Sequence, residues 1–454
     1  MYFAGTLYWL ADTVSTFGGQ SPAVGVLVAG VLVAYLALFP AAFALILARL
    51  CRALGPRGLL LAPAVWVTTE LWRHYVWVGF PWILLGYSQV TVLPVAQIAS
   101  VVGVYGLSAV VAAVSTAAAL LVLDRGRVRW AFAAIVAALL SGTVVWGHAR
   151  LKTSVLLTHG QPVRVGVLQG NVAQEMKWDP ARRGPITDLY LGMTRRALAQ
   201  GATFVIWPES SYPVPFEQDL VGGAAVRRLA VESGATLLIG SDQVEPVRGT
   251  REAPQSRYYN AAFLVKPDGS TGAVYRKMQL VPFGEYVPLK TLLFFVGPIV
   301  EAVSDFSPGA DPVLLPVGRH TASTAICYEV IFPNLIRRFV RDGSELLTTI
   351  TNDAWYGRSS AAYQHWEQAS MRAIEQGRYL ARSANTGISG FVDPYGRILQ
   401  KTELFEAAVL VQDLRFLTDR TVYNRIGDLV AWLSLALTVA ALLATGRRRT
   451  TTAR

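Results

Sequence analysis

Charged residues are scarce in this chain and unevenly distributed. Only 16% of the 454 residues are charged and 53% are hydrophobic, whereas soluble proteins carry about a quarter charged residues. Residues 1–147 contain very few charges and residues 426–445 contain one, Asp428. The stretch between them has the composition of a water-soluble protein. This pattern excludes a wholly soluble protein and predicts a membrane part, a globular part and a second membrane part.

Several residues and motifs that identify enzyme classes are also missing. The chain has no G-x-S-x-G elbow, no Walker A loop, no H-E-x-x-H pair and no Cys/His cluster with zinc spacing. Its two cysteines are Cys51 and Cys327, and its five histidines are scattered, at positions 74, 148, 159, 320 and 365. We therefore expect no metal, no cofactor and no Cys–His pair, and we interpret His320 as a structural or surface residue.

Long apolar runs are what the chain has instead. A membrane span needs about 20 apolar residues, and five segments qualify: Ala23–Ala48, Leu59–Val76, Leu93–Leu123, Trp130–Trp146 and Ile426–Thr445. The shorter apolar piece Met1–Leu10 lacks a basic start and a small-residue cleavage site, so it does not read as a signal peptide.

Basic residues in the short loops predict the orientation of these spans. Three regions on one side carry the arginines, at positions 49, 52 and 57, then 125, 127 and 129, then 447, 448, 449 and 454. By the positive-inside rule this side is cytoplasmic, and the globular part is then extracytoplasmic. Arg150 and Lys152 in the connection 147–161 are an exception. The net charge of +11 is thus explained by contacts with lipid headgroups rather than with nucleic acid. The two cysteines fall on opposite sides, which excludes a disulfide between them.

The loop Trp72–Gln97 between two spans is rich in aromatic residues. One interpretation is a belt of tryptophans at the membrane surface, and the other is a portal for lipid or substrate beside an active site. Glu70 and Arg73 at the membrane edge could pair with each other or extend towards the headgroups.

Strands alternate with helices in the globular part. Apolar strands are expected at 163–171, 202–210, 236–244, 321–330 and 346–355, and helices up to Arg195–Leu198 and over Asp219–Ser233, Asn334–Arg341 and His365–Tyr379. Hairpins are expected at 258–277, where Pro267-Asp268-Gly269 forms the turn, and from 388 to 396. This alternation predicts a layered α/β domain with helices covering sheets.

Three residues that can perform chemistry follow predicted strands. Glu209 ends the strand in WPES, Lys277 ends the strand in YRKMQLVPFGEYVP, and Cys327 ends the strand in AICYEV. Taken singly, Cys327 could be a buried hydrophobic residue, and the other two could be solvated charges. Together they suffice for acyl transfer through a thioester. The thiol is the nucleophile, with a pKa lowered by the lysine and a helix N-terminus, the carboxylate is the base, and the ammonium with a backbone N–H binds the oxyanion.

Long motifs in the chain resemble those of the apolipoprotein N-acyltransferase family, the membrane branch of the carbon–nitrogen hydrolase (nitrilase) superfamily. The globular part contributes LQGNVAQEMKWDP (168–180), VIWPES (205–210), YRKMQLVPFGEYVP (275–288), AICYEVIFP (325–333), TNDAWYG (351–357) and QHWEQASMRAIEQGRYLARSANTGISG (364–390). The membrane part contributes STFGG (15–19) and GFPWILLGYSQ (79–89). The resemblance extends over nearly the whole chain.

The resemblance implies a nitrilase-like αββα sandwich inserted between transmembrane helices. It implies a catalytic Glu-Lys-Cys triad at Glu209, Lys277 and Cys327, with Glu285 assisting the lysine. It also implies that Trp178, Tyr328 and Glu329 contribute to activity or substrate binding. Asn352 and Asp353 are interpreted as structural residues. The family usually has further transmembrane helices before the segment that begins here at Met1, so a shortened or mis-started but competent enzyme is expected.

The expected domains are residues 1–150 (transmembrane), 161–415 (nitrilase-like), 424–446 (transmembrane helix) and 447–454 (basic cytoplasmic tail). The expected enzyme is an acyltransferase of the bacterial cytoplasmic (inner) membrane. Its partners are the lipid bilayer, a phospholipid donor, which the resemblance implies is phosphatidylethanolamine, and diacylglyceryl apolipoprotein acceptors. Two alternatives are a membrane-tethered amidase or nitrilase that uses water as acceptor, and an inactive scaffold that only binds lipoproteins.

Overall fold

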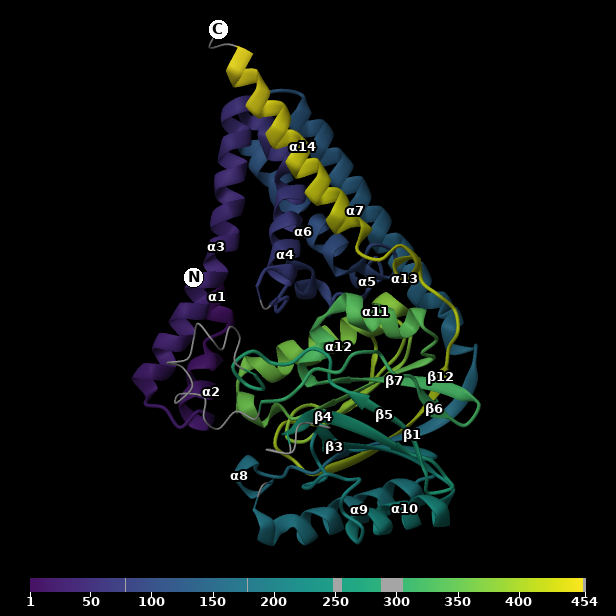
Figure 1. Ribbon diagram of the computed structural model, residues 1–454. Helices are drawn as coiled ribbons and strands as arrows, with labels where there is room; N and C mark the ends of the chain where they lie inside the picture. Colours follow the sequence, from purple (N-terminus) through teal and green to yellow (C-terminus); the bar gives the residue numbers. More distant parts are fainter. Residues whose placement is uncertain (78, 178, 248–254, 287–304, 452–454) are drawn as a thin grey trace.

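A computed structural model describes residues 1–77, 79–177, 179–247, 255–286 and 305–451. Five helices form the membrane-spanning part: α3 (Pro22–Leu54), α4 (Ala62–Tyr75), α6 (Ala99–Leu123), α7 (Val128–Thr153) and α14 (Leu429–Thr451). They converge at the end that carries the C-terminus, and the two-sheet domain lies beyond their opposite ends (Figure 1). The chain therefore builds one membrane part from both of its ends and inserts the sheet domain between them.

Among the described residues, four stretches are long and apolar enough to cross a membrane: Pro22–Tyr75, Ala99–Leu123, Val128–Leu157 and Leu429–Gly446. The first joins the expected spans Ala23–Ala48 and Leu59–Val76, because the 3-10 turn η1 (Gly55–Leu61) links α3 directly to α4. The expected span Leu93–Leu123 is interrupted. Its first residues form the short helix α5 (Leu93–Ala96), and Gly103 adopts φ 67° inside α6.

The inserted domain contains two six-stranded sheets. The first has the order β12-β1-β2-β3-β4-β5 and the second the order β11-β10-β9-β8-β7-β6. Strands β1 to β3 are parallel, as are β7 to β9, and the flanking strands are antiparallel. The strand bounds are β1 Gln161–Gln169, β2 Phe204–Ile206, β3 Thr236–Val247, β4 Gln255–Val265, β5 Thr271–Arg276, β6 Leu315–Val317, β7 His320–Ile326, β8 Leu346–Thr351, β9 Leu380–Ala384, β10 Gly390–Val392, β11 Ile398–Lys401 and β12 Ala408–Phe416.

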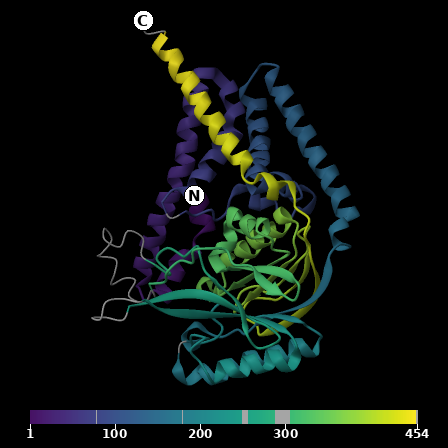
Figure 2. The ribbon, with the colours of Figure 1, turned by 45° about the vertical axis from the view of Figure 1, so that its right-hand side comes forward.

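Helices cover the outer face of each sheet. Helices α9 (Arg183–Ala199) and α10 (Gly222–Ser233) pack on the first sheet, and α11 (Pro333–Arg341) and α12 (Ser360–Gln376) cover the second on the side of the membrane helices (Figures 1 and 2). Apolar residues of both sheets, such as Val165 and Ile350, share one core between them. The expected αββα sandwich is confirmed.

Most of the expected elements are present, but the strands β6, β9 and β12 were not predicted. The hairpin of β4 and β5 turns at the expected place, with Gly269 at φ 78°. Strand β9 follows α12 directly, where the sequence predicted a helix up to Tyr379; α12 instead ends at Gln376 because Gly377 caps it at φ 61°. Strand β12, which pairs with β1, was not predicted.

Part of the aromatic loop contacts the sheet domain. We call residues 79–92 the junction loop. Its Trp82 is buried and donates through Nε1 to Gln364 Oε1 of α12 at 2.8 Å. Glu70 and Arg73 are both buried, so they do not extend towards headgroups, and each binds this loop. Glu70 Oε1 accepts from the N–H of Leu85 at 2.7 Å, and Arg73 donates to the carbonyl of Trp82 at 2.9 Å.

The first residues of the chain also pack on the sheet domain. They form the short helices α1 (Tyr2–Thr6) and α2 (Trp9–Phe17). Trp9 stacks edge-on against Tyr356, with ring centroids 5.0 Å apart, and Thr13 donates to the carbonyl of Trp355 at 2.8 Å. The membrane part is thus attached to the sheet domain both here and at the junction loop.

Candidate active site

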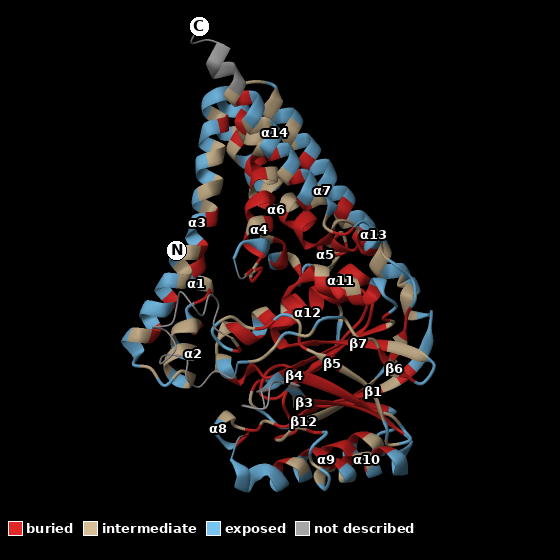
Figure 3. Ribbon diagram, viewed as in Figure 1, coloured by how far each residue is buried: buried red, intermediate tan, exposed pale blue. Residues whose placement is uncertain are grey.

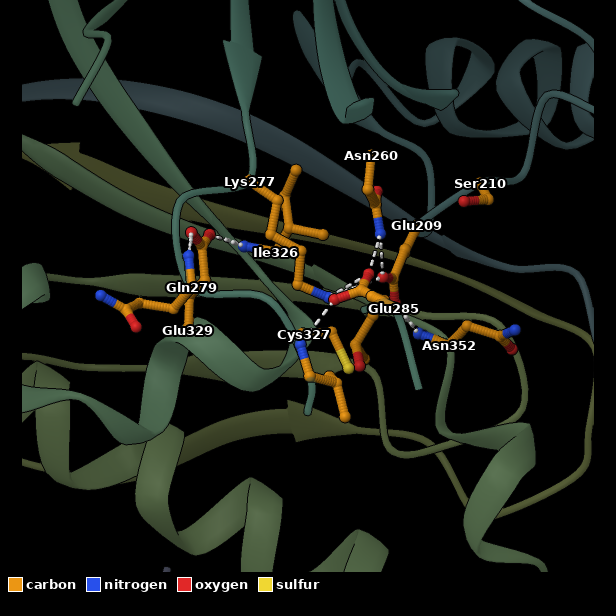
Figure 4. A network of polar contacts seen from close by, with 12 residues as sticks. Glu209, Ser210, Asn260, Lys277, Gln279, Glu285, Ile326, Cys327, Glu329 and Asn352 are labelled. Atoms are coloured by element: carbon orange, nitrogen blue, oxygen red, sulfur yellow. Dashed lines mark hydrogen bonds and ion pairs between the residues drawn. The ribbon is translucent and has the colours of Figure 1, made fainter. Parts of the chain in front are cut away.

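The ends of three strands bring together the residues that the sequence singled out. Glu209 follows β2, Lys277 follows β5, and Cys327 follows β7 as the first residue of the 3-10 helix η6 (Cys327–Ile331). The first two strands belong to one sheet and the third to the other. Because the two sheets pack face to face, their ends meet, and Figure 4 shows the three side chains in one buried cluster.

Lys277 lies at the centre of a hydrogen-bonded cluster of polar side chains. Its Nζ is 2.8 Å from Glu285 Oε1 and 3.4 Å from Glu209 Oε1. Asn260 on β4 donates through Nδ2 to the same two oxygens, at 2.7 Å for Glu209 and 2.9 Å for Glu285. The N–H of Asn352 donates to Glu209 Oε2 at 2.8 Å. Both carboxylates are therefore held in fixed orientations.

Opposing effects set the charges of this cluster. Burial raises the pKa of Glu209, but Lys277 and the hydrogen bond from Asn260 outweigh it and hold that pKa below its usual value. Burial lowers the pKa of Lys277, and the adjacent carboxylates of Glu285 and Glu209 more than reverse this. At neutral pH Glu209 is thus a carboxylate and Lys277 an ammonium ion.

The state of the Cys327 thiol differs from the sequence-based expectation. Cys327 is buried and adopts φ 51°, a left-handed conformation that is strained for a residue other than glycine. Burial and the charge of Glu209 raise the pKa of its thiol, and the opposing effect of Lys277 is too small to reverse the shift. The expectation of a thiolate stabilised by the lysine is therefore wrong for this closed site. The resting group is a thiol, and it needs a base.

Glu329 connects the strand end of Lys277 to that of Cys327. One carboxylate oxygen accepts from the N–H of Met278 at 2.6 Å and from Tyr275 Oη at 2.7 Å, and the other accepts from the N–H of Ile326 at 2.7 Å. Burial raises the pKa of Glu329 to about 7, because its effect is larger than that of these hydrogen bonds, which lower the pKa. Glu329 therefore holds the two strand ends together through its hydrogen bonds.

Tyr328 faces the junction loop. Its hydroxyl donates to the carbonyl of Gly79 at 3.0 Å, and its ring is buried. Trp178, also expected at the site, lies outside the described residues. Its neighbour Lys177 is buried and donates through Nζ to the carbonyl of Glu209 at 3.1 Å. Burial lowers the pKa of Lys177 to about 8.

Sequence reasoning missed Asn260 and Lys177 at this site. Asn260 is the only amide in the apolar run YYNAAF, and a polar residue inside a buried strand was the signal that could have identified it. Lys177 lies beside Trp178 in the motif LQGNVAQEMKWDP, where the resemblance implies a role for the tryptophan and not for the lysine. The interpretation of His320 as structural agrees with its contact to Glu345, 2.6 Å away.

No group of three or more His, Cys, Asp or Glu that could hold a metal occurs among the described residues. The cluster offers a thiol, a fixed carboxylate and a fixed ammonium ion. These groups can carry out acyl transfer at a carbonyl carbon without a metal.

The chain matches two family models. Residues 164–419 match carbon–nitrogen hydrolase, and residues 1–117 match the apolipoprotein N-acyltransferase N-terminal domain. It is 39% identical to an apolipoprotein N-acyltransferase of Geobacter metallireducens, over 98% of this chain and 85% of that protein. It is 34% identical to one of Shewanella oneidensis, over 94% of this chain and 82% of that protein. An amidase structure from Nesterenkonia sp. is 24% identical, covering 59% of this chain and 95% of that one, with a TM-score of 0.41.

The two family models and the two relatives span both the membrane helices and the sheet domain. The chain belongs to the apolipoprotein N-acyltransferase family, the membrane-embedded members of the carbon–nitrogen hydrolases.

Proposed function

We propose that this membrane acyltransferase moves a fatty acyl chain from a phospholipid to the α-amine of the N-terminal diacylglyceryl-cysteine of a lipoprotein, through a thioester on Cys327. Membership of the family supports the reaction. The observation that carries the assignment of residues is the buried contact of Lys277 with both Glu209 and Glu285, beside the Cys327 thiol.

In the first half-reaction Cys327 attacks the ester carbonyl of the phospholipid. Glu209 accepts the thiol proton as the Sγ–C bond forms, and the ammonium of Lys277 with a backbone N–H binds the oxyanion. The tetrahedral intermediate collapses when the ester C–O bond breaks. Glu209 returns the proton to the departing oxygen, so a lysophospholipid leaves and a thioester remains.

In the second half-reaction the lipoprotein amine attacks the thioester carbonyl. Glu209 accepts a proton from the attacking nitrogen and passes it to the sulfur as the C–S bond breaks. The products are an amide and the regenerated Cys327 thiol. Glu285 stays bound to Lys277 and keeps the ammonium ion in place through both halves.

A membrane enzyme suits these substrates because both are lipids or lipid-anchored. Moving a chain out of the bilayer costs about 0.8 kcal/mol per CH₂, and a site reached from the membrane avoids most of that cost. The preferred donor is phosphatidylethanolamine, a proposal that follows the resemblance rather than any residue of the site.

We also propose that the sheet domain is extracytoplasmic and the C-terminus cytoplasmic. The basic ends of the membrane helices support this orientation. The loop after α3, the turn between α6 and α7 and the end of α14 gather at the end of the helices away from the sheet domain (Figure 1). Arg49 lies beside Gly446 of α14. A cluster of arginines at one end is typical of the cytoplasmic side.

The experiment that tests the site is intact-mass analysis after incubation of the detergent-purified protein with a phosphatidylethanolamine of defined chains. We expect one added acyl mass that neutral hydroxylamine removes. Cys327→Ala should show no adduct, and Cys51→Ala, which removes the other cysteine, should behave as wild type. An adduct that persists in Cys327→Ala, or one that hydroxylamine leaves intact, contradicts the proposed thioester.

A further inference from the structure

A second buried polar cluster lies next to Cys327 and takes no part in the proposed proton transfers. It consists of Asp353, His365 on α12 and Arg382 on β9, all fully buried. His365 Nε2 is 3.1 Å from the carbonyl oxygen of Cys327. Arg382 Nη2 is 3.0 Å from His365 Nδ1 and 2.8 Å from Asp353 Oδ2.

The contacts of His365 place a proton on Nε2. A carbonyl oxygen only accepts, so Nε2 must carry the proton that it donates to Cys327. Nδ1 has two competing contacts, because Arg382 would donate to its lone pair and Asp353 Oδ1, 3.1 Å away, would accept a proton from it. Whichever of these two contacts is the hydrogen bond, Nε2–H donates to the Cys327 carbonyl.

The carbonyl that His365 binds belongs to a peptide group with a second role. The C=O of Cys327 and the N–H of Tyr328 are the two ends of one planar trans peptide, so they point in opposite directions. A hydrogen bond that fixes the carbonyl towards α12 also fixes where the Tyr328 N–H points. Because Cys327 is held at φ 51°, a conformation that a cysteine rarely adopts unaided, this peptide needs such a restraint.

We infer that His365 is a positioning residue that locks the Cys327–Tyr328 peptide, so that the Tyr328 N–H serves with Lys277 as the donor to the oxyanion. Asp353 and Arg382 contact Nδ1 and hold the ring in the orientation that makes this hydrogen bond. The inference rests on the proposed function only in taking Cys327 as the nucleophile.

The same segment also reaches the base. Asn352, the neighbour of Asp353, donates its N–H to Glu209 Oε2. On the membrane side, the ring of Trp82 packs on His365 with centroids 5.5 Å apart. The Cys327–Tyr328 peptide and the junction loop thus both contact His365, and Glu209 is bound by the neighbour of Asp353.

The test compares two reactions of the same thiol. Acylation by p-nitrophenyl butyrate passes through an oxyanion, whereas alkylation by iodoacetamide displaces iodide and forms none. The variants are His365→Phe, which keeps a ring without a donor, and His365→Gln, whose amide can donate to the Cys327 carbonyl. Glu209→Gln is the control that weakens the base and should slow both reactions.

We expect His365→Phe to slow acylation by about 10²–10³-fold, the effect of losing one oxyanion donor, while alkylation changes little. His365→Gln should recover a large part of the acylation rate. Equal loss of both reactions in His365→Phe, or acylation at the wild-type rate, would overturn the inference. A different result would contradict the proposed function and leave this inference standing: wild type forms no adduct with phospholipid, while wild type and variants react with p-nitrophenyl butyrate at the expected relative rates.

Discussion

The membrane helices and the sheet domain place their polar and apolar residues in opposite ways. Helix α7 turns large apolar side chains outward, including Ile135, Leu139 and Val145, whereas α12 buries charged ones, including Arg372 and Glu375. Figure 3 shows the contrast: most of the two sheets is buried and much of the membrane helices' surface is exposed. The exposed apolar surface is explained by lipid, and the buried charges mark the places where the chain does chemistry or joins its two parts.

The two arrangements meet at the break in α6. Glu375 of α12 accepts from the N–H of Val104, one residue after the left-handed Gly103, at 2.8 Å. Arg372 lies 3.2 Å from Glu375 and donates to the Tyr87 hydroxyl of the junction loop at 2.7 Å. Helix α12 of the sheet domain thus accepts a hydrogen bond from a backbone N–H at the break in α6. This contact holds the membrane part and the sheet domain in one orientation.

The largest effect should come from removing the buried cation of the site. Lys277→Met leaves the carboxylates of Glu209 and Glu285 unpaired, which typically destabilises a protein by about 3–5 kcal/mol, and it removes the oxyanion's charged partner. We expect acylation by phospholipid to fall at least about 10³-fold. The rate of adduct formation and the unfolding midpoint in detergent measure the two effects.

Lys266→Met is the matched control, because Lys266 pairs with Asp268 at the surface. Its acylation rate and unfolding midpoint should equal those of wild type. If Lys266→Met lost as much acylation rate and stability as Lys277→Met, the buried position of Lys277 would have no special role, which would contradict this account.

A smaller effect should follow from filling the break in α6. A Cβ at Gly103 would overlap the ring of Tyr423, and the residue's φ of 67° is strained for alanine. We expect Gly103→Ala to destabilise the protein by about 2–4 kcal/mol, the sum of a left-handed penalty and overpacking. Gly142→Ala in α7 meets no atom within 4 Å and should leave the midpoint unchanged or raise it. Equal midpoints of thermal unfolding for the two variants in detergent would contradict the close packing of Gly103 on Tyr423.

The hydroxyl of Tyr328 should contribute less. Tyr328→Phe leaves the Gly79 carbonyl without this donor, which we expect to cost about 1 kcal/mol of stability and to lower acylation less than the loss of Lys277. Tyr363→Phe, at an exposed tyrosine, controls for the loss of a hydroxyl. A 10³-fold loss of acylation in Tyr328→Phe would instead assign this hydroxyl to the chemistry.

The smallest effect should be the acid sensitivity that Glu209 contributes. Its folded pKa lies below the ordinary value, so its stabilisation is complete above the unfolded pKa and is lost as pH falls through the folded one. Between pH 7 and pH 3.5 wild type should therefore lose more stability than Glu209→Gln. Identical losses, measured by unfolding midpoints in detergent, would mean that Glu209 is not held as a carboxylate.

The sequence predicted the fold where patterns are local. Strand β2 (FVI) is a continuous apolar run, and the β4–β5 turn carries its own glycine. Strand β9 was missed because its sequence LARSA contains Arg382 and Ser383, whose partners come from distant segments. Strand β12 was missed because its burial does not alternate regularly.

The site was predicted only as far as residue types and strand ends reveal it. Glu209, Lys277 and Cys327 each follow a strand, and the structure brings them together as expected. The raised pKa of the thiol depends on burial, and the left-handed Cys327 and its bond to His365 depend on packing between α12 and η6. His365 and Cys327 are 38 residues apart in the sequence, and no local pattern indicates that they are in contact.

The most direct test of the central claim is the fate of the acyl group after it reaches Cys327. Wild-type protein acylated by phosphatidylethanolamine would be freed of excess lipid and mixed with a diacylated lipopeptide that has a free N-terminal amine. This account predicts that the acyl mass leaves the protein and appears as an amide on the lipopeptide, while an N-acetylated lipopeptide leaves the adduct in place. Release as free fatty acid at the same rate with either peptide would contradict acyl transfer and identify a hydrolase.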